Sequence, residues 1–288
     1  MRPENLKTLI YLDGGNPEET RKIKDILGFL DGQTTNPSFV SKNPEARKRL
    51  EQGKRFTTQE LLDFYKALVE EISGLIPEGS VSIEVYADQN TSTEQMLDWA
   101  RDMNAWIPNA HIKFPTTREG LEAAHQAVSE GLRVNMTLCF SQQQAAAVYA
   151  ATKGAARGQV YLSPFVGRLY DEGQNGMDLT RNILRMFEQG DGHVMLLTAS
   201  VRDLDQFLES IRLGTDIVTC KFETLKEWAD TGLSLPGSDF TSAPGDVAPI
   251  PYQELDLTRD WQSFDLGHYK TDEGMEKFST DWNKLLKE

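Results

Sequence analysis

Long apolar runs are missing from this 288-residue sequence. No stretch of about 18 apolar residues occurs, so we expect no membrane-spanning helix and no membrane partner. The first residues, MRPENLKTLIYLDGG, lack the basic region and long apolar run of a signal peptide. The sequence therefore predicts a cytoplasmic protein.

Cysteine, histidine and nucleotide-binding motifs are also scarce or absent. Cys139 and Cys220 lie in apolar, strand-like runs, so we expect two buried, reduced thiols rather than a disulfide. No GxGxxG, Walker or GxSxG motif occurs, so neither nucleotide binding nor serine-hydrolase chemistry is supported and no cofactor is expected. Histidines are scattered without the spacing of metal ligands, and no metal site is predicted. They are His111, His125, His193 and His268.

Negative charge outweighs positive charge. The chain has 30 Lys and Arg against 44 Asp and Glu, a net charge of -14. No basic stripe is available to neutralise nucleic-acid phosphates, so we expect no nucleic-acid partner. An enzyme acting on small anions would have to gather positive charge locally, around a few particular arginines.

The pattern that is present is a short β-branched run followed by a helical segment, repeated eight times. Strands that alternate with helices pair in parallel, and eight such units predict a (β/α)8 TIM barrel in a single domain spanning residues 1–288. A doubly wound open sheet is the competing architecture. The predicted strands are Thr8–Leu12, Gly32–Thr35, Val81–Tyr86, Ala110–Phe114, Val134–Cys139, Val160–Phe165, Val194–Ala199 and Asp216–Cys220. Helical spacing of apolar residues marks Thr57–Ser73, Ser92–Trp106, Thr117–Ser129, Ser141–Thr152, Asp178–Gln189, Leu204–Leu213 and Glu223–Asp230.

The C-terminal part departs from this pattern. Leu233–Tyr252 is rich in Pro, Gly and Ser, so we expect an irregular arm over residues 233–271. A last helix is predicted over residues 272–287, with Thr271 as its N-cap. This helix would pack across the barrel or against a partner subunit of a homo-oligomer.

Strand alternation predicts which side chains enter the barrel lumen. In four strands one face is apolar and would pack on the outer helices. These residues are Ile10, Leu12, Val81, Ile83, Val85, Ile112, Phe114, Val134, Met136 and Leu138. The opposite, lumen side would hold Asp13, Glu84, Lys113, Asn135 and Thr137. Barrel interiors are normally packed with branched apolar side chains, so a lysine and two carboxylates there suggest chemistry. An ion-pair network without chemistry is the alternative.

A neutral lysine amine attacks a ketone, and the carbinolamine that forms must lose water by proton transfers. Asp13 and Glu84, on separate strands, suit two such duties beside Lys113. Arg168 and Arg202 follow the sixth and seventh predicted strands, at the ends where barrel enzymes place their active sites. Two guanidiniums that converge on one anion match a sugar phosphate.

Seven segments of the predicted barrel, taken in this order, resemble the transaldolase family. They are YLDGGN (Tyr11–Asn16), DGQTTNPS (Asp31–Ser38), SIEVYA (Ser82–Ala87), HIKFP (His111–Pro115), NMTLCFS (Asn135–Ser141), SPFVGR (Ser163–Arg168) and TASVR (Thr198–Arg202). The tail segment TDEGMEKFSTDW resembles the family as well. Members transfer a dihydroxyacetone unit from a ketose phosphate, such as sedoheptulose 7-phosphate or fructose 6-phosphate, to an aldose phosphate. The reaction belongs to the non-oxidative pentose phosphate pathway.

The resemblance also implies residue roles. Lys113 matches the Schiff-base lysine, Asp13 the general acid/base, and Glu84 with Thr137 the pair that holds a catalytic water. Positions that line the sugar site are matched by Asn36, Asn135, Ser163 and Phe165, and the phosphate group by Arg168, Ser200 and Arg202.

Two other functions stay open. The related fructose-6-phosphate aldolases release free dihydroxyacetone. They usually carry Gln in place of Glu84 and Tyr in place of Phe165, so these two residues favour the transferase. A sugar-phosphate-binding homologue without turnover is the third possibility. Gly14-Gly15 and the arm depart from the usual family pattern, which leaves the acceptor sugar and the assembly open.

Overall fold

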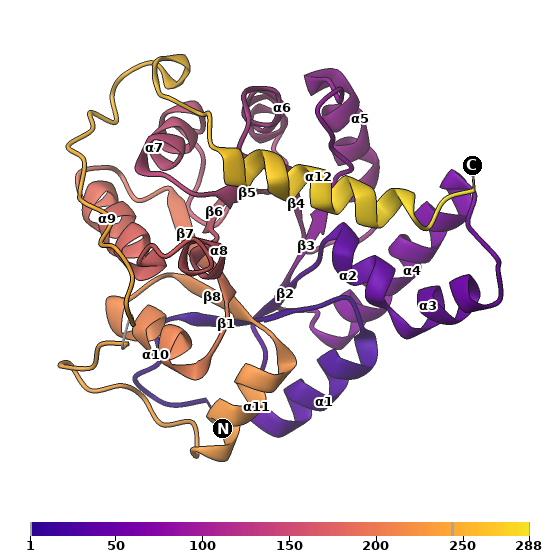
Figure 1. Ribbon diagram of the computed structural model, residues 1–288, viewed down its shortest axis with the longest axis horizontal. Coiled ribbons are helices and arrows are strands. Elements are labelled where there is room, and N and C mark those ends of the chain that lie inside the picture. Colours follow the sequence, from indigo (N-terminus) through magenta and orange to yellow (C-terminus); the bar gives the residue numbers. More distant parts are fainter. Residues whose placement is uncertain (1, 243–244, 288) are drawn as a thin grey trace.

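The sheet is a closed barrel of eight parallel strands in sequence order, with β1 paired to both β2 and β8. The computed structural model describes residues 2–242 and 245–287, and Figure 1 looks down the barrel. The prediction of a (β/α)8 barrel is therefore confirmed, and each predicted strand boundary lies within two residues of the observed one. The strands are β1 (Leu9–Asp13), β2 (Gly32–Thr34), β3 (Ser80–Glu84), β4 (Ala110–Pro115), β5 (Val134–Cys139), β6 (Val160–Pro164), β7 (Val194–Val201) and β8 (Ile217–Cys220).

Helices alternate with the strands, and most of them surround the barrel (Figure 1). They are α1 (Pro17–Leu27), α2 (Pro37–Lys42), α3 (Pro44–Glu51), α4 (Thr58–Leu75), α5 (Thr93–Asn104), α6 (Arg118–Ser129), α7 (Gln142–Ala151), α8 (Val166–Tyr170), α9 (Gly176–Phe187), α10 (Leu204–Leu213), α11 (Phe222–Asp230) and α12 (Tyr269–Asn283). Local sequence fixes their starts: Thr57 and Glu60 form a capping box for α4, and Asn16 caps α1 just before a proline. No helix in the described residues is long and apolar enough to cross a bilayer.

Apolar side chains fill the layer between the strands and the outer helices. Ile10, Leu12, Val81 and Ile83 are fully buried there, as the alternation of the strands predicts, and Trp228 of α11 is among the largest buried side chains. Cys139 and Cys220 are buried free thiols, as expected. The core thus holds eight strand ends rigidly around one opening, which we call the mouth: the C-terminal end of the barrel.

The last helix begins at Tyr269, so the prediction of Thr271 as its N-cap is wrong. His268 is the N-cap, and its ring nitrogen accepts the Lys270 backbone N–H at 3.2 Å. Thr271 is instead buried, and its hydroxyl donates to the Leu138 carbonyl at 2.9 Å. The Thr271 hydroxyl is therefore used in a contact with β5 and does not cap the helix. The local sequence does not predict this contact. The helix also ends at residue 283 rather than 287.

Helix α12 lies across the mouth in Figure 1, the first of the two placements expected for it. Its Asp281 accepts a short hydrogen bond from Ser38 of α2. Helix α12 also passes close to Leu138 and Arg168. This requires glycine at position 274, because a Cβ there would lie 2.6 Å from Leu138 and 2.7 Å from the Arg168 guanidinium. The helix therefore roofs the opening and contacts residues at the ends of β5 and β6.

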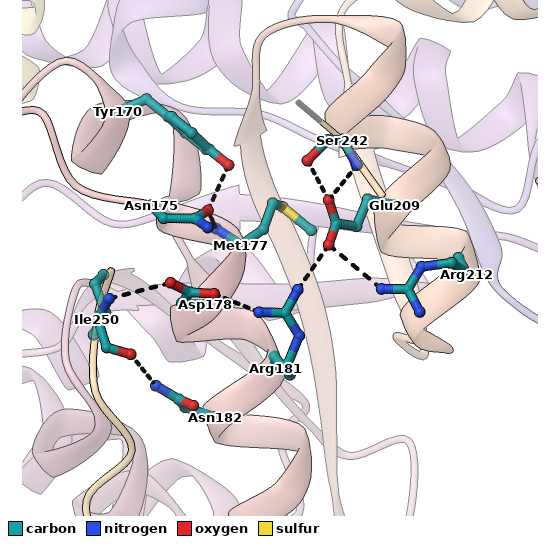
Figure 2. A network of polar contacts seen from close by, with 10 residues as sticks. All are labelled: Tyr170, Asn175, Met177, Asp178, Arg181, Asn182, Glu209, Arg212, Ser242 and Ile250. Carbon is teal, nitrogen blue, oxygen red and sulfur yellow. Dashed lines mark hydrogen bonds and ion pairs between the residues drawn. The ribbon is translucent and has the colours of Figure 1, made fainter. Parts of the chain in front are cut away.

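The arm, predicted over residues 233–271, ends before α12 begins at Tyr269. Its described residues are 233–242 and 245–268, and they include a 3-10 helix, Trp261–Ser263. In Figure 1 it runs around the outside past α10 and α9. Figure 2 shows how it is held: Glu209 of α10 accepts the Ser242 backbone N–H at 2.8 Å, while Ile250 is bonded through its N–H to Asp178 and through its carbonyl to Asn182. The expected irregular arm is thus fastened by polar contacts.

Candidate active site

The predicted lysine is buried in the lumen beside a carboxylate. Glu84 of β3 and Lys113 of β4 are register partners, which places both side chains on the same face of the sheet. Lys113 Nζ lies 2.6 Å from Glu84 Oε2 and donates to the Thr35 carbonyl at 3.0 Å. Their side chains are 3% and 5% exposed, so the pair is almost fully removed from solvent. An amine in this position is shielded from water and held by neighbouring strands.

A second carboxylate lies at the end of β1. Asp13 is half-buried, and its Oδ1 accepts a hydrogen bond from Thr34 at 2.7 Å. Burial raises the pKa of Asp13 above its ordinary value, against the opposing effects of Lys113, Thr34, Lys221 and Arg168. Such a carboxyl holds a proton more readily than one in water.

Burial likewise raises the pKa of Glu84, although Lys113 and then Arg168 oppose the rise. The Lys113 contact is the one polar contact that the described residues supply to this carboxylate. Nearby, the Thr137 hydroxyl is buried and has no hydrogen-bond partner among those residues. Glu84 Oε2 and the Thr137 hydroxyl are therefore two buried polar groups with unused bonding capacity.

Two of the four predicted sugar-site residues form a chain of hydrogen bonds with Ser82. Ser163 of β6 donates to Asn135 Oδ1 at 2.7 Å, and Asn135 donates onward to Ser82 at 3.1 Å. Asn36 has a structural duty as well, because its side-chain oxygen accepts the Phe39 N–H at 3.0 Å and caps α2. Burial and these bonds fix the side-chain orientations around Lys113.

Strand alternation fails at two bulges near the mouth. The β5–β6 register shifts between Met136 and Cys139, and Leu138 has a φ of 58°. Leu138 therefore packs on Gly274 of α12 at the mouth, and its predicted place facing the outer helices is wrong. The reason is that a bulge inserts one residue and re-aims those around it. Ser200 lies at the matching shift between β7 and β8, with a φ of 59°.

The two predicted phosphate-binding arginines differ in their partners. Arg168 stacks over Phe165 at 5.2 Å and Phe278 at 5.4 Å, and burial lowers its pKa. Arg202 is 41% exposed and forms an ion pair with Asp171 at 2.6 Å. The charge of Arg202 is therefore shared with a carboxylate, whereas that of Arg168 faces aromatic rings.

A cavity of about 400 Å³ opens among these residues. Of the eleven predicted site residues, nine line it. The other two, Glu84 and Asn135, lie directly behind lining residues, against Lys113 and Ser163. The nine are Asp13, Asn36, Lys113, Thr137, Ser163, Phe165, Arg168, Ser200 and Arg202.

Sequence reasoning missed part of the cavity wall. Four further lysines line it, together with Phe278 and Ser38. Lys270 and Lys277 are on α12, whose position over the mouth is a tertiary feature without a local signal. Lys221 could have been found, because it directly follows β8 just as Asp13 ends β1. The four lysines are Lys42, Lys221, Lys270 and Lys277.

The described ranges 2–242 and 245–287 contain no group of three or more His, Cys, Asp or Glu side chains that could hold a metal ion. Of the histidines, His111 stacks on Tyr161 with centroids 3.9 Å apart, and burial lowers its pKa to about 3. It is neutral near pH 7 and packs inside the barrel.

A family model described as Transaldolase/Fructose-6-phosphate aldolase matches residues 10–288. A probable transaldolase from Dehalococcoides mccartyi is 35% identical over 239 aligned residues, covering 81% of this chain and 98% of the relative. One from Roseiflexus sp. is 38% identical over 218 residues, covering 76% and 88%. One from Brucella melitensis is 37% identical over 227 residues, covering 79% and 91%. The matched range contains every residue that lines the cavity.

Proposed function

The chain belongs to the transaldolase/fructose-6-phosphate aldolase family, and we propose that this enzyme is a transaldolase that works through a Schiff base on Lys113. It would move a dihydroxyacetone unit from a ketose phosphate, such as sedoheptulose 7-phosphate or fructose 6-phosphate, to an aldose phosphate. The pairing of buried Lys113, which lines the cavity, with Glu84 directly behind it carries the proposal. The names of relatives 35–38% identical to the chain support it.

In the first half of the reaction, the Lys113 amine adds to the C2 carbonyl of the ketose. The carbinolamine loses its hydroxyl as water when it receives a proton, and a protonated iminium remains. Glu84, with a water held between it and Thr137, would supply that proton, and the raised pKa of Glu84 favours its protonated form.

In the second half, the iminium acts as an electron sink. Asp13 removes the proton of the C4 hydroxyl, the C3–C4 bond breaks, and its electron pair moves to the iminium to give an enamine. The aldose phosphate leaves. An acceptor aldehyde then enters, the enamine carbon attacks it, and Asp13 returns the proton to the new alkoxide. Water then adds to the iminium that remains, and the breakdown of this carbinolamine releases the new ketose phosphate and restores the Lys113 amine. The raised pKa of Asp13 suits a group that takes and returns one proton.

The other residues in and around the cavity would bind the substrate. Asn135 and Ser163, bonded to each other, would hold the hydroxyls of the dihydroxyacetone unit. Arg168, Ser200 and Arg202 would bind the phosphate. Retention of the enamine until an acceptor arrives separates the transferase from an aldolase, and Glu84 and Phe165 favour the transferase by their likeness to that branch.

Borohydride trapping tests the covalent step. Incubation with fructose 6-phosphate and borohydride should add a reduced dihydroxyacetone or hexose unit to the peptide that contains Lys113. Lys113→Met should abolish this label, whereas Lys270→Met, which removes another cavity lysine, should leave it in place. An unlabelled wild-type protein would exclude the Schiff base.

Acceptor dependence tests the transferase. With fructose 6-phosphate as donor, we expect turnover only when an aldose phosphate such as erythrose 4-phosphate is added. Release of free dihydroxyacetone at the full rate without acceptor would identify an aldolase instead.

A further inference from the structure

The cations of the cavity differ in whether a carboxylate already neutralises them. Lys113 contacts Glu84 at 2.6 Å, and Arg202 contacts Asp171 at 2.6 Å. Each lysine that α12 contributes also has an acidic partner: Lys270 contacts Glu172 and Glu273, and Lys277 contacts Asp281. Within residues 2–242 and 245–287, the three lining cations left without an ion pair are Lys42, Arg168 and Lys221.

The two arginines expected to bind the phosphate do not supply enough unpaired positive charge to match it. A sugar phosphate carries about -1.5 to -2 charges near pH 7. Of the two arginines expected to bind it, Arg202 shares its charge with Asp171, so Arg168 alone offers a cation that no carboxylate neutralises. A second free cation beside this pair would complete the match.

Lys221 occupies the place that such a cation needs. The ladder pairs Tyr11 with Thr219 and ends at Leu12 and Cys220. Asp13 and Lys221 are the next residues of the two chains, and the charge of Lys221 acts on Asp13. In strand order, Lys221 at the end of β8 therefore lies between Arg202 at the end of β7 and Asp13 at the end of β1.

The side chain of Lys221 is free for a ligand. Lys221 is the N-cap residue of α11, its side chain forms no ion pair with the described residues, and it is exposed within the cavity wall. An ammonium without a carboxylate partner keeps its charge for an incoming anion and loses no existing ion pair when the anion binds.

We propose that Lys221 is a specificity-determining residue that binds the phosphate of the aldose phosphate, together with Arg168. This inference rests on the proposed transferase, in which Asp13 serves the bond between C3 and C4 and the aldose part extends from there toward Arg168. Lys221 selects phosphorylated acceptors over neutral aldehydes and takes no part in forming the Schiff base.

The test compares acceptors in the wild-type enzyme, Lys221→Met and Lys221→Arg. The kcat/KM is measured for D-glyceraldehyde 3-phosphate and for unphosphorylated D-glyceraldehyde, with fructose 6-phosphate as donor. A hydrogen bond to a charged group contributes about 1.5–3 kcal/mol, so the ratio of the two values should fall by about tenfold or more in Lys221→Met. Lys221→Arg should restore most of the ratio.

A matched control removes the same charge outside the cavity. Lys226 of α11 is five residues further along and pairs with Asp230 at 2.7 Å. Lys226→Met should leave the ratio unchanged. An equal loss in both lysine-to-methionine variants would show that net charge, and not a contact by Lys221, sets the preference, and would overturn the assignment.

Lys221 could instead act only through the charge of Asp13, on which its own charge acts. In that case Lys221→Met would lower kcat/KM equally for both acceptors and would shift the pH profile of both, and the proposal would be wrong. A selective loss for the phosphorylated acceptor, with an unchanged pH profile for D-glyceraldehyde, supports phosphate binding.

A binding measurement separates this inference from the proposed function. Titration of the wild-type protein and Lys221→Met with inorganic phosphate in a calorimeter needs no turnover. Weaker phosphate binding by the variant supports the Lys221 site even if no transfer reaction is found. Equal binding by both proteins overturns it even if the wild-type enzyme is an active transaldolase.

Discussion

Two buried glutamates, one in the lumen and one under the arm, are almost equally shielded but differ in their bonding. The side chain of Glu84 is 5% exposed and that of Glu209 is 2% exposed. Each lies beside at least one cation. Burial alone therefore does not distinguish a site of chemistry from a structural contact, and the number of partners does.

Glu209 is fully engaged. It contacts Arg181 at 2.8 Å and Arg212 at 3.4 Å, and it accepts hydrogen bonds from both the N–H and the hydroxyl of Ser242 (Figure 2). A buried carboxylate with all its acceptor sites in use fixes geometry and cannot exchange protons without breaking that geometry. This network holds the arm to α10.

Among the described residues, the Glu84 side chain has one polar contact, with Lys113, and the Thr137 hydroxyl has no hydrogen-bond partner. Incompletely bonded buried polar groups cost free energy, so they are found mainly where a function needs them. Each glutamate thus has an ion pair, but Glu84 keeps unused bonding capacity beside the cavity, whereas the acceptor sites of Glu209 are in use.

The largest expected effect is on catalysis, from Glu84→Gln. The amide keeps the volume but cannot exchange a proton, so we expect kcat for transfer to fall by about 10²- to 10⁴-fold. The free energy of unfolding should change less than in the Glu209 variant described next, because burial already favours a neutral group at this position. Steady-state kinetics and urea unfolding measure both. Activity within twofold of the wild type would remove Glu84 from the proton-transfer steps.

The opposite response is expected at the arm. Glu209→Ala leaves the buried Ser242 N–H without its acceptor and two arginines without their carboxylate, so the free energy of unfolding should fall by about 2–3 kcal/mol. Because α12 is bound separately through Thr271 and Asp281, kcat should stay within about twofold. Asp205→Ala, which removes an exposed carboxylate from the same helix, is the control. A large loss of kcat in the Glu209 variant would show that the arm controls the site.

The Glu84 half of this comparison could be predicted from the sequence, because alternate residues of a barrel strand point to opposite faces. This alternation predicts that Lys113 and Glu84 share the lumen side, and in the structure they are register partners whose buried side chains contact each other. Glu209 gave no comparable signal. It is one of several charged residues on an amphipathic helix, and its burial depends on an arm that reaches it from 33 residues further along the chain.

The features that the sequence did not predict share one physical cause, which is dependence on distant segments of the chain. The bulge at Leu138 depends on register with β6, and the role of Thr271 depends on a carbonyl 133 residues away. Lys221 lies just beyond the strand that was predicted to end at Cys220, and its lack of an ion pair can be judged only in three dimensions. Local periodicity predicts faces, whereas bulges, long-range caps and charge balance arise from packing between distant segments.

The smallest expected effect is on the pH dependence of stability, and it contrasts Asp13 with a well-bonded surface carboxylate. The pKa of Asp13 is raised, by burial first, so between the ordinary carboxyl pKa and the raised one the folded protein binds more protons than the unfolded chain. The free energy of unfolding contributed by Asp13 therefore falls as the pH rises through this window. Asp13→Asn removes that loss. The variant should be nearly as stable as the wild type near pH 4 and more stable at pH 7.

Glu60 should behave in the reverse way. The Thr57 backbone N–H and Arg49 lower its pKa to about 2, so its contribution to stability is present at neutral pH and is lost as the pH falls toward that value. Glu60→Gln should therefore lower Tm at pH 7 and match the wild type more closely in acid. Thermal unfolding of the three proteins from pH 3 to pH 8 measures both trends. An Asp13→Asn variant less stable than the wild type at pH 7 would show that the Asp13 carboxylate stabilises the fold as an ion-pair partner of Lys113. Asp13 would then belong with the fully bonded carboxylates, such as Glu209, and not with Glu84.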